Sequence, residues 1–342
     1  MYRLRCPVCS GINAAARFIL QERKDRRNLR RGESMELAID FGGTNIKMAA
    51  FEKGEKEPLW TESMLSYSDR GMEQALMRVQ EQILQRTQEK PDIMGIALPG
   101  IVDSQRKRLL TVNKKFKNAE GFDFQEWCSR TFGCPLVMEN DANAALLGET
   151  AYGCAVGKKN AVMMILGTGI GTAAVIDGRL LRGSHYRAGI MGGHSVIQIN
   201  GRKCNCGAYG CLEAYAGAAE FTDSVKKEPG FAESTLSTEG ELTMKSIFAA
   251  AEKGEAFAKE QVERLIGYYE SGVLNLVYAY DPECVILSGG IAKGSTALAG
   301  RLEKFINGQP WMTGVSVSVL VAENPDFSVT LGLRKRMEDY QG

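Results

Sequence analysis

Two segments of the sequence repeat one pattern, and this repetition constrains the fold more than any other feature. In residues 36–51 and again in residues 162–177, an apolar run leads into a short turn rich in glycine and threonine, and a second apolar run follows, at 46–51 and at 173–176. Two strand-like runs joined by such a turn are typical of a β-hairpin. We therefore predict a diverged internal duplication in which each copy opens on a hairpin.

The remaining sequence alternates between strand-like and helix-like periods. Short apolar runs predict further strands at 93–98, 136–138, 284–287 and 315–321. Helical spacing of apolar residues predicts helices at 72–84, from about 142, at 243–253 and at 256–280. This alternation predicts an α/β fold with largely buried sheets, and 342 residues suffice for two domains.

Charge and cysteine content narrow the class of protein. The net charge is +1, but residues 1–34 carry nine Lys/Arg against three Asp/Glu, so the rest of the chain is weakly acidic. A weakly acidic body argues against nucleic-acid binding. Nine cysteines, an odd number without a signal core, are typical of a reducing compartment, so we expect a cytoplasmic protein. No run approaches about 18 apolar residues, so we expect no membrane span.

Residues 1–34 differ in composition from the strand-like sequence that begins at Met35. They are basic and have little apolar periodicity, which is typical of an unstructured extension or a mis-assigned start. The alternative is a small accessory element. Cys6 and Cys9 could form half of a zinc site, but no second pair accompanies them locally.

Both glycine-rich turns could bind phosphate groups. Consecutive small residues leave backbone N–H groups free to converge on an anion. One such turn alone is more often only structural, but the recurrence favours anion binding. In the first turn, Asp40 adds a carboxylate suited to holding Mg²⁺, directly or through water. Gly289 and Gly290 end another strand-like run, where a tight structural turn is the simpler explanation.

Asp141 follows a predicted strand and precedes a predicted helix. The structural interpretation is that Asp141 caps this helix, because Asp and Asn are both favoured at that position. The functional interpretation is a general base that accepts the proton of a hydroxyl during phosphoryl transfer. The two interpretations are compatible.

One histidine and three cysteines lie within a short glycine-rich segment. His194, Cys204, Cys206 and Cys211 supply four soft ligands, and only two histidines exist in the whole chain. This inventory predicts a tetrahedral structural zinc ion. The alternative is a set of free thiols.

Taken together, six segments resemble the ROK family of sugar kinases, open reading frames and repressors, which belongs to the actin-like superfamily. The segments are residues 40–47 (DFGGTNIK), 98–102 (LPGIV), 139–145 (ENDANAA), 167–172 (GTGIGT), 204–213 (CNCGAYGCLE) and 287–291 (LSGGI). The cysteine segment is the most specific of them, and the resemblance covers residues 35 to about 336.

The resemblance implies two actin-like (ribonuclease H-like) lobes with an active-site cleft between them. On this prediction the first lobe spans residues 35–150 together with a C-terminal helix at about 324–342, and the second lobe spans 151–323 and carries the zinc loop. ATP contacts are implied for Asp40, Gly42, Gly43, Thr44, Asn45, Lys47, Gly167, Thr168, Gly169, Gly171, Thr172, Gly289 and Gly290. Sugar contacts are implied for Gly100, Asn113, Asn140, Asp141, His194 and Glu213, with Asp141 as the catalytic base.

The implied activity is transfer of the γ-phosphoryl group of ATP to the 6-hydroxyl of a hexose, with ATP and Mg²⁺ as cofactors and a structural Zn²⁺. Glucose is the expected sugar, and N-acetylhexosamine, mannose, allose and fructose are the alternatives. The family usually has a glutamate shortly before the zinc histidine, whereas Ile190 or Met191 occupies that place here. We also expect a homodimer. The rival from another class is a sugar-responsive ROK transcriptional regulator, although residues 1–34 are too short for a complete winged helix.

Overall fold

The computed structural model describes residues 34–112, 115–238, 240–293, 295–323 and 325–340. Residues 1–34 and 35–342 form separate units. The predicted basic extension, with Cys6 and Cys9, lies outside the described residues except for Ser34.

The first sheet has five strands in the order β3-β2-β1-β4-β7. Their bounds are β1 Met35–Phe41, β2 Asn45–Glu52, β3 Pro58–Leu65, β4 Ile93–Leu98 and β7 Leu136–Asn140. Strand β2 is antiparallel to both of its neighbours, β3 and β1, whereas β1, β4 and β7 run parallel to one another. Parallel strands end at the same edge of a sheet, so Phe41, Leu98 and Asn140 finish side by side.

The second sheet repeats this plan in the order β10-β9-β8-β11-β12. Its strands are β8 Ala161–Leu166, β9 Ile170–Ile176, β10 Arg179–Leu180, β11 Cys284–Ser288 and β12 Ser318–Val321. Strands β8 and β9 are antiparallel, and β8, β11 and β12 are parallel. Both predicted hairpins are therefore present, and the shared strand order supports the predicted duplication.

Two strands begin three residues from their predicted starts, and β7 ends at Asn140 rather than at 138. Strand β9 begins at Ile170 rather than at 173, because Leu166 pairs with Ile170 across a turn of only three residues. Strand β12 begins at Ser318 rather than at 315, because the amide of Val315 closes a turn on the carbonyl of Met312 at 3.2 Å.

The other elements connect the strands and cover the sheets. The helices are η2 Ser68–Arg70, α2 Met72–Arg86, α3 Phe124–Thr131, α4 Asp141–Tyr152, η3 Gly192–His194, α5 Glu213–Ala216, α6 Ala218–Val225, η4 Thr235–Ser237, α7 Met244–Glu252, α8 Ala256–Tyr280, α9 Thr296–Asn307, η5 Pro310–Met312 and α10 Ser328–Glu338. A small hairpin joins β5 Ile101–Asp103 to β6 Arg108–Thr111.

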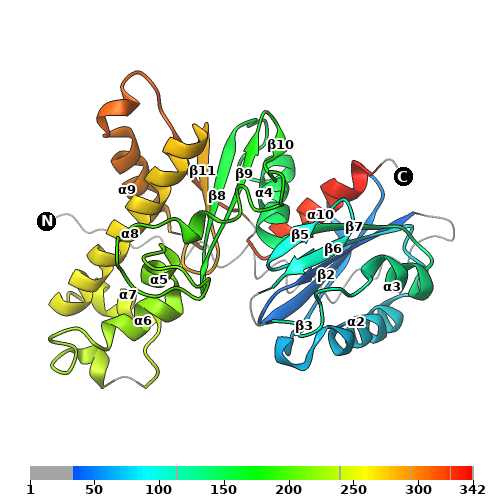
Figure 1. Ribbon diagram of the computed structural model, residues 1–342, viewed down its shortest axis with the longest axis horizontal. Coiled ribbons are helices and arrows are strands. Elements are labelled where there is room, and N and C mark those ends of the chain that lie inside the picture. Colours follow the sequence, from blue (N-terminus) through cyan, green and yellow to red (C-terminus); the bar gives the residue numbers. More distant parts are fainter. Residues whose placement is uncertain (1–33, 113–114, 239, 294, 324, 341–342) are drawn as a thin grey trace, which may run out of the picture. The chain divides into compact units, whose positions relative to one another are not determined.

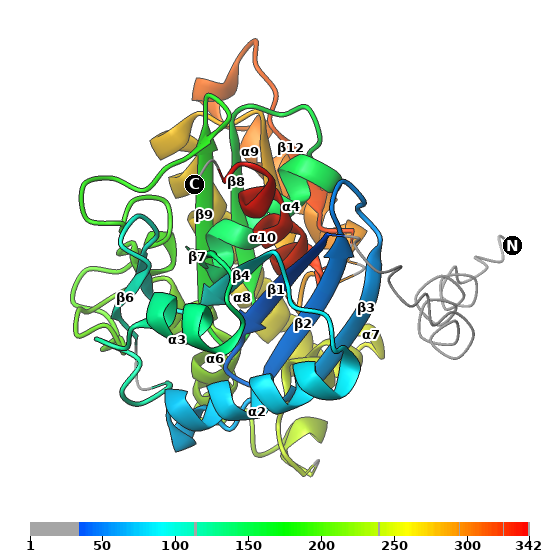
Figure 2. The ribbon, with the colours of Figure 1, turned by 90° about the vertical axis from the view of Figure 1, so that its right-hand side faces the viewer.

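Two central helices pack against the two sheets and against each other (Figures 1 and 2). Helix α10 packs Leu333 and Met337 against the first sheet, and α4 packs Ala145 and Leu146 against the second. The two helices meet at glycine: a Cβ atom at Gly332 would lie only 1.7 Å from the carbonyl oxygen of Ala144. This close approach holds α4, the helix that carries Asp141, in a fixed place between the sheets.

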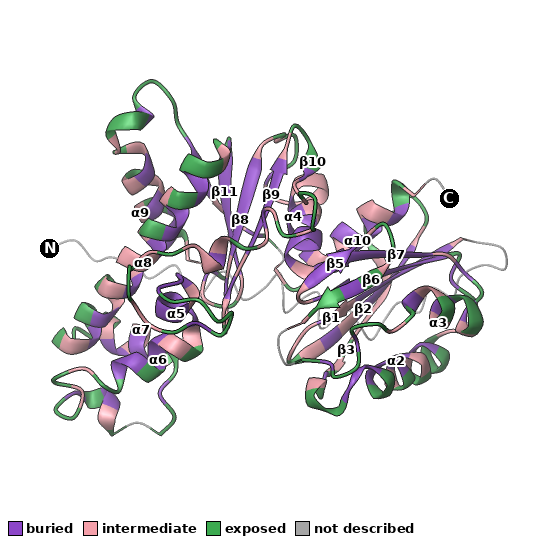
Figure 3. Cartoon of the chain, in the orientation of Figure 1, coloured by how far each residue is buried: buried purple, intermediate pink, exposed green. Residues whose placement is uncertain are grey.

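The outer helices bury the other faces. Helices α6, α8 and α9 cover the second sheet with a large apolar core that includes Phe221, Tyr269 and Leu302. In the first lobe, Cys128 of α3 contacts the sulfur of Met94 on β4 at 4.0 Å. The parallel strands other than β12 are buried along nearly their whole length (Figure 3), as expected for sheets covered on both faces. Within the described residues, no helix combines the length and apolar character that a membrane span requires.

Candidate active site

The first glycine-rich turn joins β1 to β2 and is closed by its own backbone. A Cβ atom at Gly42 would lie 2.6 Å from the carbonyl oxygen of Asn45, so only glycine fits there without movement. The turn is held from outside, because Ser66 donates to the carbonyl of Thr44 at 2.8 Å and the Ser68 hydroxyl donates to that of Gly43 at 3.2 Å. The sequence-predicted positions Gly42 to Asn45 therefore form one rigid corner at the strand ends.

Asn140, rather than Asp141, caps helix α4. The side-chain oxygen of Asn140 accepts from the amide of Asn143 at 3.0 Å, and its NH₂ group donates to the carbonyl of Gly100 at 2.9 Å. Asp141 is the first helical residue, so the prediction that it caps the helix was wrong. The physical reason is that two adjacent residues both suit an N-cap, and the helix begins at Asp141 rather than at about 142, which moves the cap position back to Asn140.

Asp141 uses one of its two carboxyl oxygens for local structure. Its Oδ1 accepts from the amide of Ala142 at 2.8 Å and from the side chain of Asn140 at 2.9 Å. Among the described residues, both of these bonds reach Oδ1, which leaves Oδ2 as the atom that can accept a proton from a substrate.

The ionised forms of Asp40 and Asp141 are both disfavoured by burial at this corner. Burial raises the pKa of Asp141 above its ordinary value, although the Ala142 amide and the charge of Lys115 oppose the shift. Burial and the charge of Asp141 together raise the pKa of Asp40 to about 7, against the opposing charge of Lys47. Such a pair of acids with raised pKa values is typical of a functional site.

Glu139, which the sequence analysis cited only as part of a motif, lies two residues before Asp141 and forms ion pairs with two arginines. It is 1% exposed, and Arg182 of the second lobe bonds its Oε2 at 2.5 Å while Arg336 lies 3.7 Å away. The side chain of Asn143 donates to its Oε1 at 3.1 Å. Glu139 therefore ties the two lobes together. Only its place beside Asp141 could have drawn attention to it, because its partners are distant in sequence.

The second glycine-rich turn, Gly167 to Gly169, is buttressed by Glu213. The carboxylate of Glu213 accepts from the amide of Ile170 at 3.0 Å, and a Cβ atom at Gly169 would strike it. The carbonyl of Gly167 accepts from the amide of Ala218 at 3.0 Å, which joins the turn to α6. Glu213, expected at the sugar, is thus engaged by the turn itself.

A cavity of about 720 Å³ opens beside this second turn. Gly167 and Thr168 line one side, Gly290 lies on another, and Met244 and Phe248 of α7 supply apolar walls. Gly289 adopts a left-handed conformation with φ of 89°, and a Cβ atom there would lie 2.4 Å from the carbonyl of Leu166. The structure therefore brings together predicted positions that are more than 120 residues apart, because Gly290 lines the same cavity as Gly167 and Thr168.

Other predicted positions lie under or beside the turns. Thr172 is fully buried, and its hydroxyl donates to the carbonyl of Gly189 at 2.7 Å and accepts from the amide of Gly192 at 2.8 Å, so it holds the loop that leads to His194. Gly171 lies in β9 against Ile165. The ammonium of Lys47 bonds Asp326 at 2.9 Å. Asn113 lies outside the described residues.

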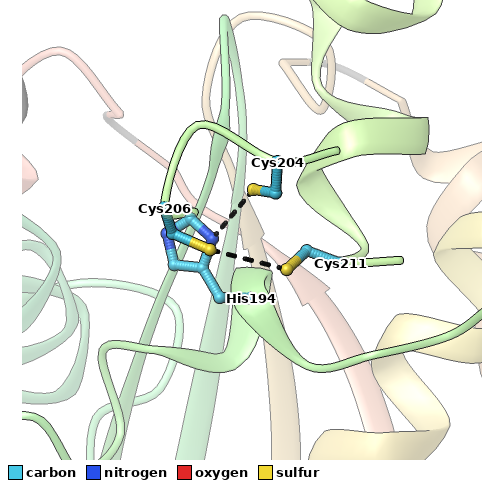
Figure 4. A group of neighbouring side chains, drawn as sticks. All are labelled: His194, Cys204, Cys206 and Cys211. Atoms are coloured by element: carbon cyan, nitrogen blue, oxygen red, sulfur yellow. Dashed lines mark hydrogen bonds between the residues drawn. The ribbon is translucent and has the colours of Figure 1, made fainter. Parts of the chain in front are cut away.

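His194, Cys204, Cys206 and Cys211 form one compact cluster (Figure 4). Their ligand atoms all lie within 4.8 Å of one another. The Sγ of Cys204 lies 3.5 Å from His194 Nδ1, and the Sγ atoms of Cys206 and Cys211 are 3.6 Å apart. Tetrahedral zinc with Zn–S bonds of about 2.3 Å separates its sulfur ligands by roughly 3.8 Å, so this donor set fits the ion.

The fold is similar to that of solved structures. A ROK family glucokinase from Streptomyces griseus, solved in complex with glucose and AMPPNP, is 24% identical and superposes with a TM-score of 0.75 over 90% of this chain and 100% of that one. The structure is thus the two-lobe actin-like fold, as the sequence predicted.

Sequence comparison gives the family directly. Residues 36–335 match the ROK family, and a glucokinase from Halalkalibacterium halodurans is 32% identical over 77% of this chain and 82% of its own length. The chain belongs to the ROK family. A xylose repressor from Bacillus subtilis is also similar, at 26% identity over 72% of this chain and 61% of the repressor.

Proposed function

We propose that this protein is an ATP-dependent sugar kinase that transfers the γ-phosphoryl group of ATP to the 6-hydroxyl of a hexose, with glucose as the main substrate. The observation that carries the proposal is the corner where the rigid first turn meets Asp141, an acid with one committed oxygen and one available oxygen. The similar glucokinases support the same activity.

ATP binding is divided between the two turns. The cavity beside Gly167, Thr168 and Gly290 has the size and apolar walls that suit an adenosine group. The amides of both turns then face the phosphate chain. Mg²⁺, when bound, would neutralise phosphate charge, and the Asp40 carboxylate is an oxygen ligand of the kind this ion prefers.

Asp141 acts as the base. Its free Oδ2 accepts the proton of the sugar hydroxyl as the phosphoryl group is transferred in line. The raised pKa of Asp141 improves its strength as a base while leaving it ionised once the pH exceeds that value. Closure of the lobes around both substrates excludes water and suppresses ATP hydrolysis.

The sugar site is proposed around Asn140, Asp141 and His194. Asn140 is locked by its bonds to Gly100 and Asn143, which orients it for a far-end hydroxyl. His194 turns Nδ1 toward Cys204, so Nε2 is the nitrogen available to a sugar. Gly100, Asn113 and Glu213 remain candidate contacts, and Glu213 can also act indirectly by fixing the second turn.

The loop before His194 sets the affinity for particular hexoses. Ile190 or Met191 takes the place of the usual glutamate, and a missing charge-assisted hydrogen bond is worth roughly 1.5–3 kcal/mol. Glucose should therefore bind weakly, and a glutamate introduced at residue 190 or 191 should lower the KM for glucose at one of these positions. An ATP-coupled assay over glucose, mannose, N-acetylhexosamines, allose and fructose tests the assignment. A tenfold higher kcat/KM for another hexose would replace glucose but keep the kinase.

A structural zinc ion is proposed at the four-residue cluster. The surrounding loop is rich in glycine and gains order from the metal rather than from a large core. Cys206→Ser should reduce zinc content from about one per chain and lower thermal stability, whereas Cys154→Ser, away from the cluster, should keep the zinc. Purified wild-type protein without stoichiometric zinc by elemental analysis would contradict this site.

Location, assembly and domain limits are further proposals. The cysteines of the described residues are free, which supports a reducing compartment such as the cytoplasm. We propose a homodimer, to be checked by light scattering, and lobes with limits at 35–150 plus 324–342 and at 151–323.

The regulator alternative is tested by a DNA-binding assay on the full chain, in which sugar-dependent operator binding without phosphoryl transfer would favour it.

A further inference from the structure

We propose that Lys115 contacts the transferred phosphoryl group, as a cation held over the first glycine-rich turn. Its side chain lies directly against Gly43: a Cβ atom at Gly43 would be 2.8 Å from the ammonium nitrogen and 2.9 Å from Cε. The ammonium group therefore rests on the backbone that is proposed to face the ATP phosphates. This inference rests on the proposed kinase function and assigns a role to a residue that no sequence motif identified.

The residue after Lys115 has a strained backbone that fixes this arrangement. Phe116 has a φ of +50°, a left-handed conformation that is unfavourable for a bulky side chain. Its ring is fully buried against Phe41, with centroids 5.9 Å apart, and its amide donates to the carbonyl of Ser68 at 2.7 Å. Strain of this kind persists where the surroundings overdetermine it, often at functional sites.

The same contacts link Lys115 to the turn itself. Phe41 is the last residue of β1, and Ser68 also donates its hydroxyl to the carbonyl of Gly43. On the far side, the carbonyl of Lys117 accepts from the amide of Met72 at 3.0 Å. Packing therefore fixes the backbone at Lys115 relative to the first turn, within reach of its ammonium group.

The charges around the corner leave Lys115 available for an anion. Lys47, the other lysine nearby, is paired with Asp326 at 2.9 Å. Within the described part of the chain, Lys115 forms no ion pair, and it is exposed. Its positive charge still reaches Asp141, because it lowers the pKa of that carboxyl against the larger effect of burial.

These contacts place Lys115 where the phosphoryl group must pass. The donor phosphate is proposed at the first turn and the accepting hydroxyl at Asp141; Lys115 lies against the turn and acts on Asp141 through its charge. Negative charge spreads over the oxygens of the phosphoryl group during transfer, and a nearby cation lowers the energy of that state. ADP lacks this group, so Lys115 should favour ATP over ADP.

The test compares Lys115→Met with Lys115→Arg and with Lys117→Met, which removes a neighbouring exposed charge. Calorimetric titration with AMPPNP and with ADP, both with Mg²⁺, measures the contact without turnover. Lys115→Met should weaken AMPPNP binding about fivefold or more, leave ADP binding within about twofold, and lower kcat by ~10–100-fold. Lys115→Arg should recover most of both losses, and Lys117→Met should match the wild type.

The outcomes separate this inference from the proposed function. A Lys115→Met protein with the wild-type ratio of AMPPNP to ADP affinity overturns the role of Lys115, even if the wild type is a kinase. An equal loss for both nucleotides also overturns it, since it would indicate a general disturbance of the turn. If the wild type phosphorylates no sugar, the kinase proposal fails, and the ratio of nucleotide affinities still decides the role of Lys115.

Discussion

The two glycine-rich turns share a backbone plan but not their surroundings. The first turn meets Asp40, Asp141 and the ammonium of Lys115, so it is surrounded by charge. The second turn meets an apolar cavity and a single acid, Glu213, whose carboxylate is already bonded to the backbone. Under the proposed function, one duplicated hairpin supplies two anion sites, and the side chains around each decide whether it performs chemistry or anchors a nucleotide.

The difference also appears in energetic cost. At the second turn, the carboxylate of Glu213 accepts a hydrogen bond of 3.0 Å from the amide of Ile170. Around the first turn, two carboxylates have pKa values raised by burial, which means that their ionised forms are disfavoured by the fold. The first region therefore carries an electrostatic cost, from two buried carboxylates, that the second region does not share.

The largest expected effect comes from removing the base beside the first turn. Asp141→Asn should lower kcat by ~10²–10⁴ because the amide cannot accept the proton. The helix should persist, since Asn140 provides the cap. Steady-state kinetics with a thermal melt measure both effects, and Asp123→Asn, which keeps a capping side chain on α3, is the matched control. A variant that keeps more than about a tenth of wild-type kcat would move the base elsewhere.

Replacing the first glycine of each turn with alanine should affect thermal stability differently in the two turns. At Gly42 a Cβ atom would lie 2.6 Å from a backbone oxygen, whereas at Gly167 the nearest such atom is 3.9 Å away. Gly42→Ala should therefore destabilise the fold by ~1–3 kcal/mol, and Gly167→Ala should leave the melting temperature nearly unchanged. Gly167→Ala should instead raise the KM for ATP, because this residue lines the cavity. Equal melting temperatures for both variants would show that the first turn is not the tighter one.

The smallest expected effect is a pH-dependent gain in stability from Asp40→Asn. The folded-state pKa of Asp40 is raised from 3.8 to about 7, so the folded form binds its proton more strongly than the unfolded form. Native stability from this group is fully present below the unfolded pKa and is lost as pH rises through the folded pKa. Asp40→Asn should thus raise the melting temperature at pH 8 more than at pH 5. The same gain at both pH values would mean that the ionised carboxyl is not disfavoured.

Local patterns predicted the hairpins and the long helix α8 because their periodicity is carried within each segment. The choice between Asn140 and Asp141 as helix cap could not be made locally, since either residue can cap and only the end of β7 decides. Glu213 and Lys115 depend on distant partners, Ile170 and Gly43, and no spacing in the sequence reports such contacts. The cluster of His194 and the three cysteines was predictable because all four side chains belong to residues 194–211.

The glycine contact between α4 and α10 has a consequence for biosynthesis. Helix α10 follows the whole second sheet in the chain, yet its apolar face completes the core of the first sheet and clamps the helix that carries Asp141. Domains generally fold as units while the ribosome delivers the chain from its N-terminus. The first lobe must therefore wait, incompletely packed, until residues 328–338 have emerged. Catalytic competence is then acquired only after translation has passed through both halves of the duplication, so a truncated nascent chain has no finished active site with which to consume ATP.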